Sequence, residues 1–228
     1  VVVTGCDKAL GGAAEDLKRA GIVLWHGHDP EHVVGARAVV VTSAMPKDHP
    51  EIVRARALGI PVIRRAEALG EAVAGGEVVG VAGTHGKTPT SSVLAEVLLG
   101  CGRDCGFLVG ARIASLDTPA RAGTDPVFVV EPDESDGTAF VLPRAGAIVT
   151  NVEPDHLEHH GGFAALRSGF DRFVADTPGP VVICLDDPVA AALARAHRDH
   201  PQLSTYGTGP AADVRLVDVS LGRDAVTW

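Results

Sequence analysis

A glycine-rich segment, Gly83-Thr84-His85-Gly86-Lys87-Thr88, carries the residue types that bind the phosphates of a nucleotide. It follows an apolar run at residues 78–82 and precedes a stretch with helical spacing at about residues 88–99. Glycines let backbone N–H groups approach phosphate oxygens, and the start of a helix adds partial positive charge. The lysine can then reach the β- and γ-phosphates, and the threonine hydroxyl can bind Mg²⁺. The segment therefore predicts an ATP-binding loop made of Gly83, Thr84, His85, Gly86, Lys87 and Thr88.

The match to the strict phosphate-loop pattern is incomplete, because Val81 rather than a glycine stands five residues before Gly86. The alternative is a plain glycine-rich turn with a surface lysine. The strand and helix patterns on either side favour the phosphate loop. Lysine at position 87 also favours a phosphate loop. The chain has 20 Lys and Arg residues, of which four are lysine, and the compact lysine ammonium suits a phosphate.

Carboxylates and histidines cluster after two later apolar runs, at residues 131–136 and 150–160. Parallel sheets bind their ligands beyond the carboxyl ends of the strands, and crowded carboxylates repel unless a divalent cation offsets their charge. An acidic surface loop is the alternative for the first cluster. A histidine of the second cluster could ligate magnesium or zinc, or position a substrate, and a solvated loop histidine is the alternative. We interpret His159 and His160 as loop residues, and His156 is assigned by the resemblance given below.

Composition excludes several classes of protein. The 228 residues are 46% apolar and 4% aromatic, with a net charge of −9, which argues against non-specific nucleic-acid binding. No apolar run reaches the roughly 20 residues that cross a bilayer, and no signal peptide is visible. The four widely spread cysteines fit reduced thiols better than a zinc knuckle. We therefore expect a cytoplasmic protein.

Short β-branched runs alternate with helical patterns, which is typical of parallel β-α-β units. The linker expected at residues 75–77 divides the chain into two α/β domains, 1–76 and 77–228. Strands are expected at 1–4, 22–25, 38–42, 60–63, 78–82, 127–130, 147–150 and 181–184, with paired strands over 213–228. Helices are expected at 10–20, 50–58, 65–74, 88–99, 163–174 and 188–197.

Taken together, the three clusters resemble the motifs of the Mur ligase family. That family's phosphate loop reads GTHGKTTT, and residues 83–90 read GTHGKTPT. Its acidic motif EADESD appears as EPDESD at 131–136, and its TN-x-E-x-DH motif appears at 150–156. Ala120-Arg121 matches the family's NAR segment in part. The motifs agree in order and spacing over nearly the whole chain.

The resemblance implies a Rossmann-like, UDP-substrate-binding domain at residues 1–76 and a P-loop-type, parallel-sheet ATP-binding domain at 77–228. It implies an ATP-dependent ligase of peptidoglycan biosynthesis that joins L-alanine to UDP-N-acetylmuramate through an acyl phosphate, using ATP and Mg²⁺. The partners would then be small-molecule substrates, with neither nucleic acid nor membrane involved.

By the same resemblance, the catalytic residues are expected to be Lys87, Glu131 and His156. Magnesium is expected to bind Thr88, Glu131 and His156. The residues expected to face the substrate are His85, Ser135 and Arg121.

Several departures from the family pattern leave alternatives open. We expect the family's first strand and glycine-rich UDP loop, and the end of its central domain, to lie outside the chain, so the chain alone should be inactive. Pro89 replaces a threonine, which the first turn of a helix tolerates. A murein-peptide recycling ligase is one alternative, although it typically reads EYD where residues 134–136 read Glu-Ser-Asp. The other is a non-catalytic, ATP-binding remnant of such a ligase.

Overall fold

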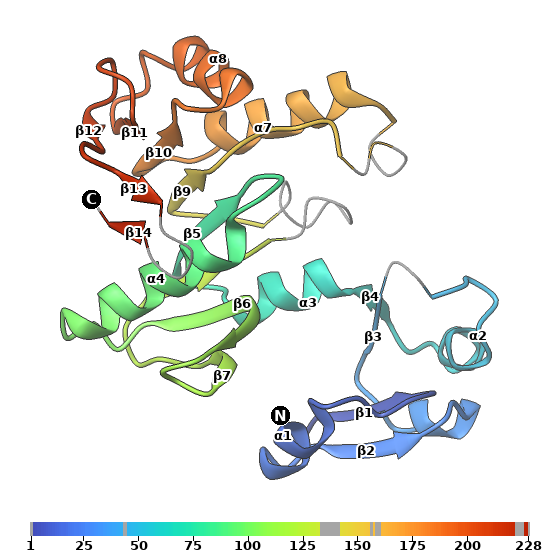
Figure 1. The fold of residues 1–228 in the computed structure, drawn as a ribbon. Coiled ribbons are helices and arrows are strands. Elements are labelled where there is room, and N and C mark those ends of the chain that lie inside the picture. Colours follow the sequence, from blue (N-terminus) through green and yellow to red (C-terminus); the bar gives the residue numbers. More distant parts are fainter. Residues whose placement is uncertain are drawn as a thin grey trace. The chain divides into compact units, whose positions relative to one another are not determined.

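The computed structural model of the chain describes residues 2–42, 45–132, 142–155, 157, 161–221 and 226–227. It divides into two compact units, residues 1–68 and 69–228. Figure 1 shows the helices and strands of both units in chain order.

Unit 1 contains two pairs of parallel strands with helices between them. Its elements are β1 (Thr4–Asp7), α1 (Ala14–Arg19), β2 (Val23–His26), the 3₁₀ helix η1 (Pro30–Val33), β3 (Val39–Val41), α2 (Pro50–Ala57) and β4 (Val62–Arg64). β1 pairs with β2, where Thr4 lies opposite Val23, and β3 pairs with β4, where Val39 lies opposite Val62. The predicted alternation of strands and helices is thus confirmed for this unit.

The first strand lies three residues later than the sequence predicts. The prediction relied on the valine run at residues 1–4, but Val2 and Val3 are 89% and 51% exposed and precede β1. Parallel pairing with β2 begins only at Thr4. β-branched residues favour strands, but the partner strand decides where the ladder begins, so this prediction was wrong in position.

Local signals set both ends of α2. Pro50 occupies the first turn, and the His49 side chain accepts a hydrogen bond from the Glu51 N–H, which has no partner within the helix. Gly59 follows the last turn with a left-handed φ of 69°. The helix predicted at residues 50–58 is confirmed to within one residue.

Unit 2 is built on an eight-stranded sheet. Its helices and strands are α3 (Arg65–Ala72, which begins in unit 1), β5 (Glu77–Ala82), α4 (Lys87–Gly100), β6 (Gly106–Ile113), β7 (Thr118–Arg121), β8 (Val127–Val130), β9 (Gly146–Val149), α7 (Phe163–Ala175), β10 (Val181–Cys184), α8 (Pro188–Ala196), β11 (Leu203–Gly207), β12 (Val214–Arg215), β13 (Ser220–Leu221) and β14 (Val226–Thr227). The sheet order is β12-β11-β10-β9-β5-β8-β6-β7, and every neighbouring pair is parallel except β6 and β7. Because β5 lies between β8 and β9, the segments that follow these three strands leave the sheet at the same edge.

The sequence did not predict three strands of this sheet, β6, β7 and β11. Glycine or polar residues interrupt each of them, so none forms the continuous apolar run that marks a buried parallel strand. The paired strands predicted over 213–228 are confirmed for β13 and β14, whereas β12 joins the edge of the large sheet beside β11. The α/β fold class is confirmed.

Helices pack on both faces of the sheet. Val81 and Ala82 are neighbours on β5 and therefore point to opposite faces. Val81 packs in a buried cluster with Ala95 of α4 and Phe107 of β6, whereas Ala82 packs in a second cluster with Phe170 of α7. α4 thus covers one face, and α7 and α8, drawn in orange in Figure 1, cover the other.

Within the described ranges, no helix is both long and apolar enough to cross a membrane.

Candidate functional site

The glycine-rich segment forms a loop between β5 and α4, as the sequence predicts. Gly86 takes the N-cap position of α4 with a left-handed φ of 79°. Gly83 has a φ of 146°, and a Cβ atom there would lie 2.0 Å from Thr150 Oγ1. Both glycines are therefore required by the shape of the loop. Pro89 lies in the first turn of α4 and does not interrupt the helix.

The residues that follow β9 hold this loop through its backbone. The Thr150 hydroxyl donates to the His85 carbonyl at 2.6 Å, and the Asn151 side-chain amide donates to the same carbonyl at 2.9 Å. Asn151 Oδ1 accepts from the His85 N–H at 2.8 Å, and its backbone carbonyl accepts from the Thr84 N–H at 3.1 Å. Thr150 and Asn151 thus clamp the loop, a role that the sequence analysis did not assign to them.

Thr150 and Asn151 hold the backbone of His85, whereas its side chain is exposed. Its Nδ1 lies 3.6 Å from Glu153 Oε1, and the two side chains are 62% and 52% exposed. The Thr84 hydroxyl and the Glu153 backbone add a further link, in which the Glu153 N–H donates to Thr84 Oγ1 at 2.8 Å. His85 can therefore reach a ligand bound over the loop, while its backbone keeps the loop in shape.

Lys87 folds back over the loop that precedes it. Its Nζ donates to the Gly83 carbonyl at 2.6 Å and to the Thr84 carbonyl at 3.3 Å. The Lys87 carbonyl in turn accepts from the Ser91 hydroxyl, which is buried. The ammonium charge and the positive end of the α4 dipole thus act on the same small volume, which favours an anion there.

A hydroxyl and a carboxylate meet beside the start of α4. The Thr88 hydroxyl donates to Glu131 Oε1 at 2.8 Å, although the two residues are 43 positions apart. The other carboxylate oxygen accepts from the Gly110 N–H at 2.6 Å. Two neighbouring ligands of an octahedral Mg²⁺ ion, each at about 2.1 Å, lie about 3 Å apart. The separation of Thr88 Oγ1 and Glu131 Oε1 therefore fits magnesium, which prefers such oxygen donors.

Gly110 of β6 is a site residue that the sequence reasoning missed. A Cβ atom there would lie 2.8 Å from Thr88 Oγ1 and 2.8 and 2.9 Å from the two Glu131 carboxylate oxygens. Glycine inside a strand often marks a close approach of this kind. No continuous apolar run surrounds Gly110, so the sequence did not predict a strand there.

The structure does not bring Arg121 to this group. Arg121 lies opposite Phe107, three positions before Gly110 on β6, or about 10 Å along the strand. Its guanidinium pairs with Asp104, whose carboxylate also accepts from the Thr124 N–H and hydroxyl. Together, Arg121 and Thr124 hold the pKa of Asp104 below its usual range, the two Thr124 hydrogen bonds being the larger cause. The substrate-binding role of Arg121 stays a prediction.

His156 and Ser135 lie outside the described residues. The same holds for the acidic residues that follow Pro132, so Glu131 is the described carboxylate of that cluster. The roles predicted for His156 and Ser135 stay predictions.

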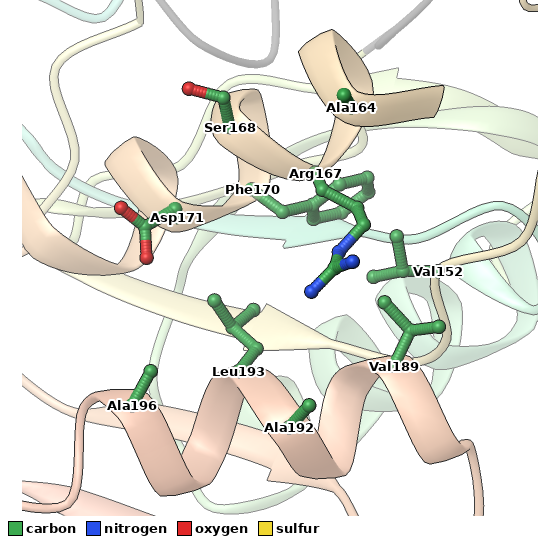
Figure 2. A pocket seen from close by; sticks show the side chains of 10 residues that line it. All are labelled: Val152, Ala164, Arg167, Ser168, Phe170, Asp171, Val189, Ala192, Leu193 and Ala196. Atoms are coloured by element: carbon green, nitrogen blue, oxygen red, sulfur yellow. The ribbon is translucent and has the colours of Figure 1, made fainter. Parts of the chain in front are cut away.

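A separate pocket lies between α7 and α8. Its volume is about 340 Å³, and its lining is mainly apolar, with the Arg167 side chain pointing into it (Figure 2). An Asp171–His197 contact of 2.8 Å links the two helices. None of the lining residues belongs to the glycine-rich loop at residues 83–86. The pocket is thus distinct from the group formed by Lys87, Thr88 and Glu131.

Comparison with known proteins covers nearly the whole chain. Residues 1–76 match the model of the Mur ligase family catalytic domain, and residues 81–227 match the Mur ligase middle domain. The UDP-N-acetylmuramate–L-alanine ligase of Acidothermus cellulolyticus is 45% identical over 97% of this chain and 47% of its own length. The chain thus spans about half the length of the curated relatives it matches.

Solved structures of similar proteins share the fold. The UDP-N-acetylmuramate-alanine ligase MurC of Thermotoga maritima matches with a TM-score of 0.79 and 28% identity, over 90% of this chain and 46% of that one. The UDP-N-acetylmuramate:L-alanyl-γ-D-glutamyl-meso-diaminopimelate ligase of Neisseria meningitides matches with a TM-score of 0.77 and 27% identity, over 90% and 69%. The middle-domain model alone covers well over half of this chain, and the catalytic-domain model covers most of the rest. This chain therefore belongs to the Mur ligase family.

Proposed function

We propose that the protein carrying this chain is an ATP-dependent ligase that joins L-alanine to UDP-N-acetylmuramate. The observation that carries the chemistry is the Thr88–Glu131 oxygen pair, 2.8 Å apart, at the start of the helix that bears Lys87. The substrates are taken from the curated relatives, which are 42–45% identical and named UDP-N-acetylmuramate–L-alanine ligases. ATP, Mg²⁺ and a cytoplasmic location belong to the same proposal.

The loop residues bind the triphosphate in this proposal. Gly83, Thr84, His85 and Gly86 form the loop that leads into α4, where the helix dipole favours an anion. The Lys87 ammonium offsets the charge that develops as the γ-phosphoryl group is transferred. The clamp by Thr150 and Asn151 keeps this geometry in place before the nucleotide binds, which lowers the entropy lost on binding.

Thr88 and Glu131 hold magnesium, and we assign His156 to the same task on the strength of its motif. When bound, the metal neutralises the repulsion between the γ-phosphate and the substrate carboxylate. The muramyl carboxylate attacks the γ-phosphorus, and ADP leaves. The alanine amine then attacks the carbonyl carbon of the acyl phosphate, an amide bond forms, a proton is lost from the nitrogen, and inorganic phosphate leaves.

The two domains divide the substrates between them in this proposal. Residues 77–228 bind ATP, and residues 1–76 bind the UDP part of UDP-N-acetylmuramate. Ser135, Arg121 and the exposed His85 imidazole are assigned to the muramyl part.

A murein-peptide ligase is the second candidate, because the Neisseria ligase matches the fold almost as well as the Thermotoga enzyme does. Sequence identity favours the alanine ligase, at 45% with the Acidothermus relative. Ser135, where a murein-peptide ligase typically has tyrosine, points the same way.

Phosphate release by the full-length protein with Mg²⁺·ATP tests both candidates. We expect release when UDP-N-acetylmuramate and L-alanine are present together, and none when either is omitted. Release with a tripeptide in place of alanine would replace our proposal by the recycling ligase. No release with either L-alanine or the tripeptide would support the non-catalytic remnant.

A further inference from the structure

Five side chains of metal-ligand type converge in unit 1. Four elements supply them: β1, the turn after β2, the η1 helix and the start of α2. Glu51 lies at their centre and is only 4% exposed, which is unusual for a carboxylate. The five residues are Cys6, His28, His32, His49 and Glu51.

Three of these side chains point their ligand atoms at one another. Cys6 Sγ lies 3.4 Å from Glu51 Oε2 and 3.5 Å from His28 Nδ1. His28 Nδ1 lies 3.3 Å from Glu51 Oε2. In the part of the chain that the structure describes, no other group of three or more such side chains brings its ligand atoms this close together.

These separations match those around a tetrahedral zinc ion. Zinc binds sulfur at about 2.3 Å and nitrogen or oxygen at about 2.0–2.2 Å, so its ligand atoms lie about 3.3–3.8 Å from one another. The three observed separations, 3.3–3.5 Å, lie within this range. Small side-chain movements are enough to admit the ion.

The remaining residues hold these ligands in place. His32 Nδ1 lies 3.0 Å from Glu51 Oε1, and the Asp29 N–H donates to the same oxygen at 3.2 Å. The His32 ring stacks on Trp25 with 4.5 Å between the ring centroids. Partners of this kind orient metal ligands and are typical of real metal sites. The His49 ring packs edge-on against the His28 ring, with 4.6 Å between the ring centroids, and so helps to orient it.

We propose that Cys6, His28 and Glu51 form a zinc-binding site in unit 1, with the fourth position open to water or to a ligand. A thiolate beside an imidazole and a carboxylate suits zinc, whereas magnesium prefers an all-oxygen set such as Thr88 and Glu131. The thiol donates its hydrogen to Glu51 in the metal-free protein. Zinc takes the place of that proton, which passes to the solvent. This inference is independent of the proposed ligase function.

Metal binding by the tag-free protein tests the site directly. Zinc is titrated in competition with a chromophoric chelator, and we expect one equivalent per chain. Cobalt(II) substituted at the site is expected to give a thiolate-to-cobalt charge-transfer band. Cys6→Ser should remove that band and weaken zinc binding by about 100-fold or more, and His28→Gln and Glu51→Gln should weaken it by at least about tenfold.

Two matched variants serve as controls, because Cys101 and His26 are exposed and lie outside the cluster. Cys101→Ser and His26→Gln should bind zinc and cobalt as the unchanged protein does. A measurement without any variant is the alkylation of cysteines by iodoacetamide, followed by peptide mapping. Zinc should protect Cys6 and leave Cys101 reactive. Less than half an equivalent of zinc bound at micromolar concentration, or equal binding by Cys6→Ser, would overturn the proposal.

Discussion

Replacing Gly110 by alanine adds one methyl group beside the two oxygens of the candidate magnesium site. The new Cβ would lie 2.8 Å from Thr88 Oγ1 and 2.8 and 2.9 Å from the Glu131 carboxylate oxygens. The φ of Gly110 is not positive, so alanine can adopt the same backbone conformation. The whole effect of Gly110→Ala therefore comes from the contact with these two side chains.

The size of the effect follows from those distances. A carbon and an oxygen atom in contact lie at least about 3.3 Å apart, so the Thr88 hydroxyl and the Glu131 carboxylate must each retreat by about 0.5 Å. A displacement of about 1 Å at a reacting centre costs about 100-fold in rate. We therefore expect kcat/KM to fall by about 10- to 100-fold, or about 1.4–2.7 kcal/mol of transition-state stabilisation. Because Gly110 is exposed, the side chains can move toward solvent, and the free energy of unfolding should fall by less than about 1.5 kcal/mol.

Phosphate release by the full-length protein at several Mg²⁺ concentrations measures the effect, and urea denaturation measures stability. The Mg²⁺ concentration needed for half-maximal rate should rise along with the loss of kcat/KM. Gly100→Ala is the matched control, since a Cβ there meets no atom within 4 Å. A kcat/KM within twofold of the unchanged protein for Gly110→Ala would refute the assignment of magnesium to Thr88 and Glu131.

Three further predictions concern the loop and a surface ion pair. Lys87→Ala should lower kcat by about 100- to 1,000-fold in the phosphate-release assay; Lys87→Arg should not restore it, because Nζ lies 2.6 Å from the Gly83 carbonyl and a planar guanidinium does not fit there. Thr150→Val removes the hydroxyl that binds the loop at 2.6 Å and should lower the free energy of unfolding by about 1–3 kcal/mol in urea denaturation; Thr150→Ser should match the unchanged protein, and equal loss in both would contradict the clamp. Arg103 and a backbone N–H lower the pKa of Asp125 to about 2, so its stabilising contribution is present above its unfolded pKa of about 3.9 and is lost as the pH falls through 2. Arg103→Gln should raise that pKa toward 3.9 in a carboxyl NMR titration, and an unchanged pKa would refute the attribution.

Local patterns in the sequence predicted the order and kind of most elements. The helix at Pro50–Ala57 is set by proline at its first position and glycine after it, and the loop at residues 83–86 is set by glycines that adopt positive φ. These signals act between neighbours in the chain, so they can be read without the fold. The boundaries of β1 and the existence of β6, β7 and β11 could not be read in this way. A strand begins and ends where its partner allows, and short strands rich in glycine or polar residues leave no apolar run.

The sequence by itself determined that a glycine-rich loop precedes a helix, that Lys87 and Thr88 stand at the start of that helix, and that acidic and histidine clusters follow later strands. It predicted phosphate binding from that arrangement. Only the tertiary structure decided which residues meet. β5 lies between β8 and β9, and β6 lies beyond β8. This strand order brings Glu131 and Gly110 next to Thr88. It also brings Thr150 and Asn151 next to His85. The convergence of Cys6, His28 and Glu51 depends in the same way on contacts across 22 to 45 positions. Local sequence patterns do not predict these contacts, because the contacts depend on how whole strands and helices pack.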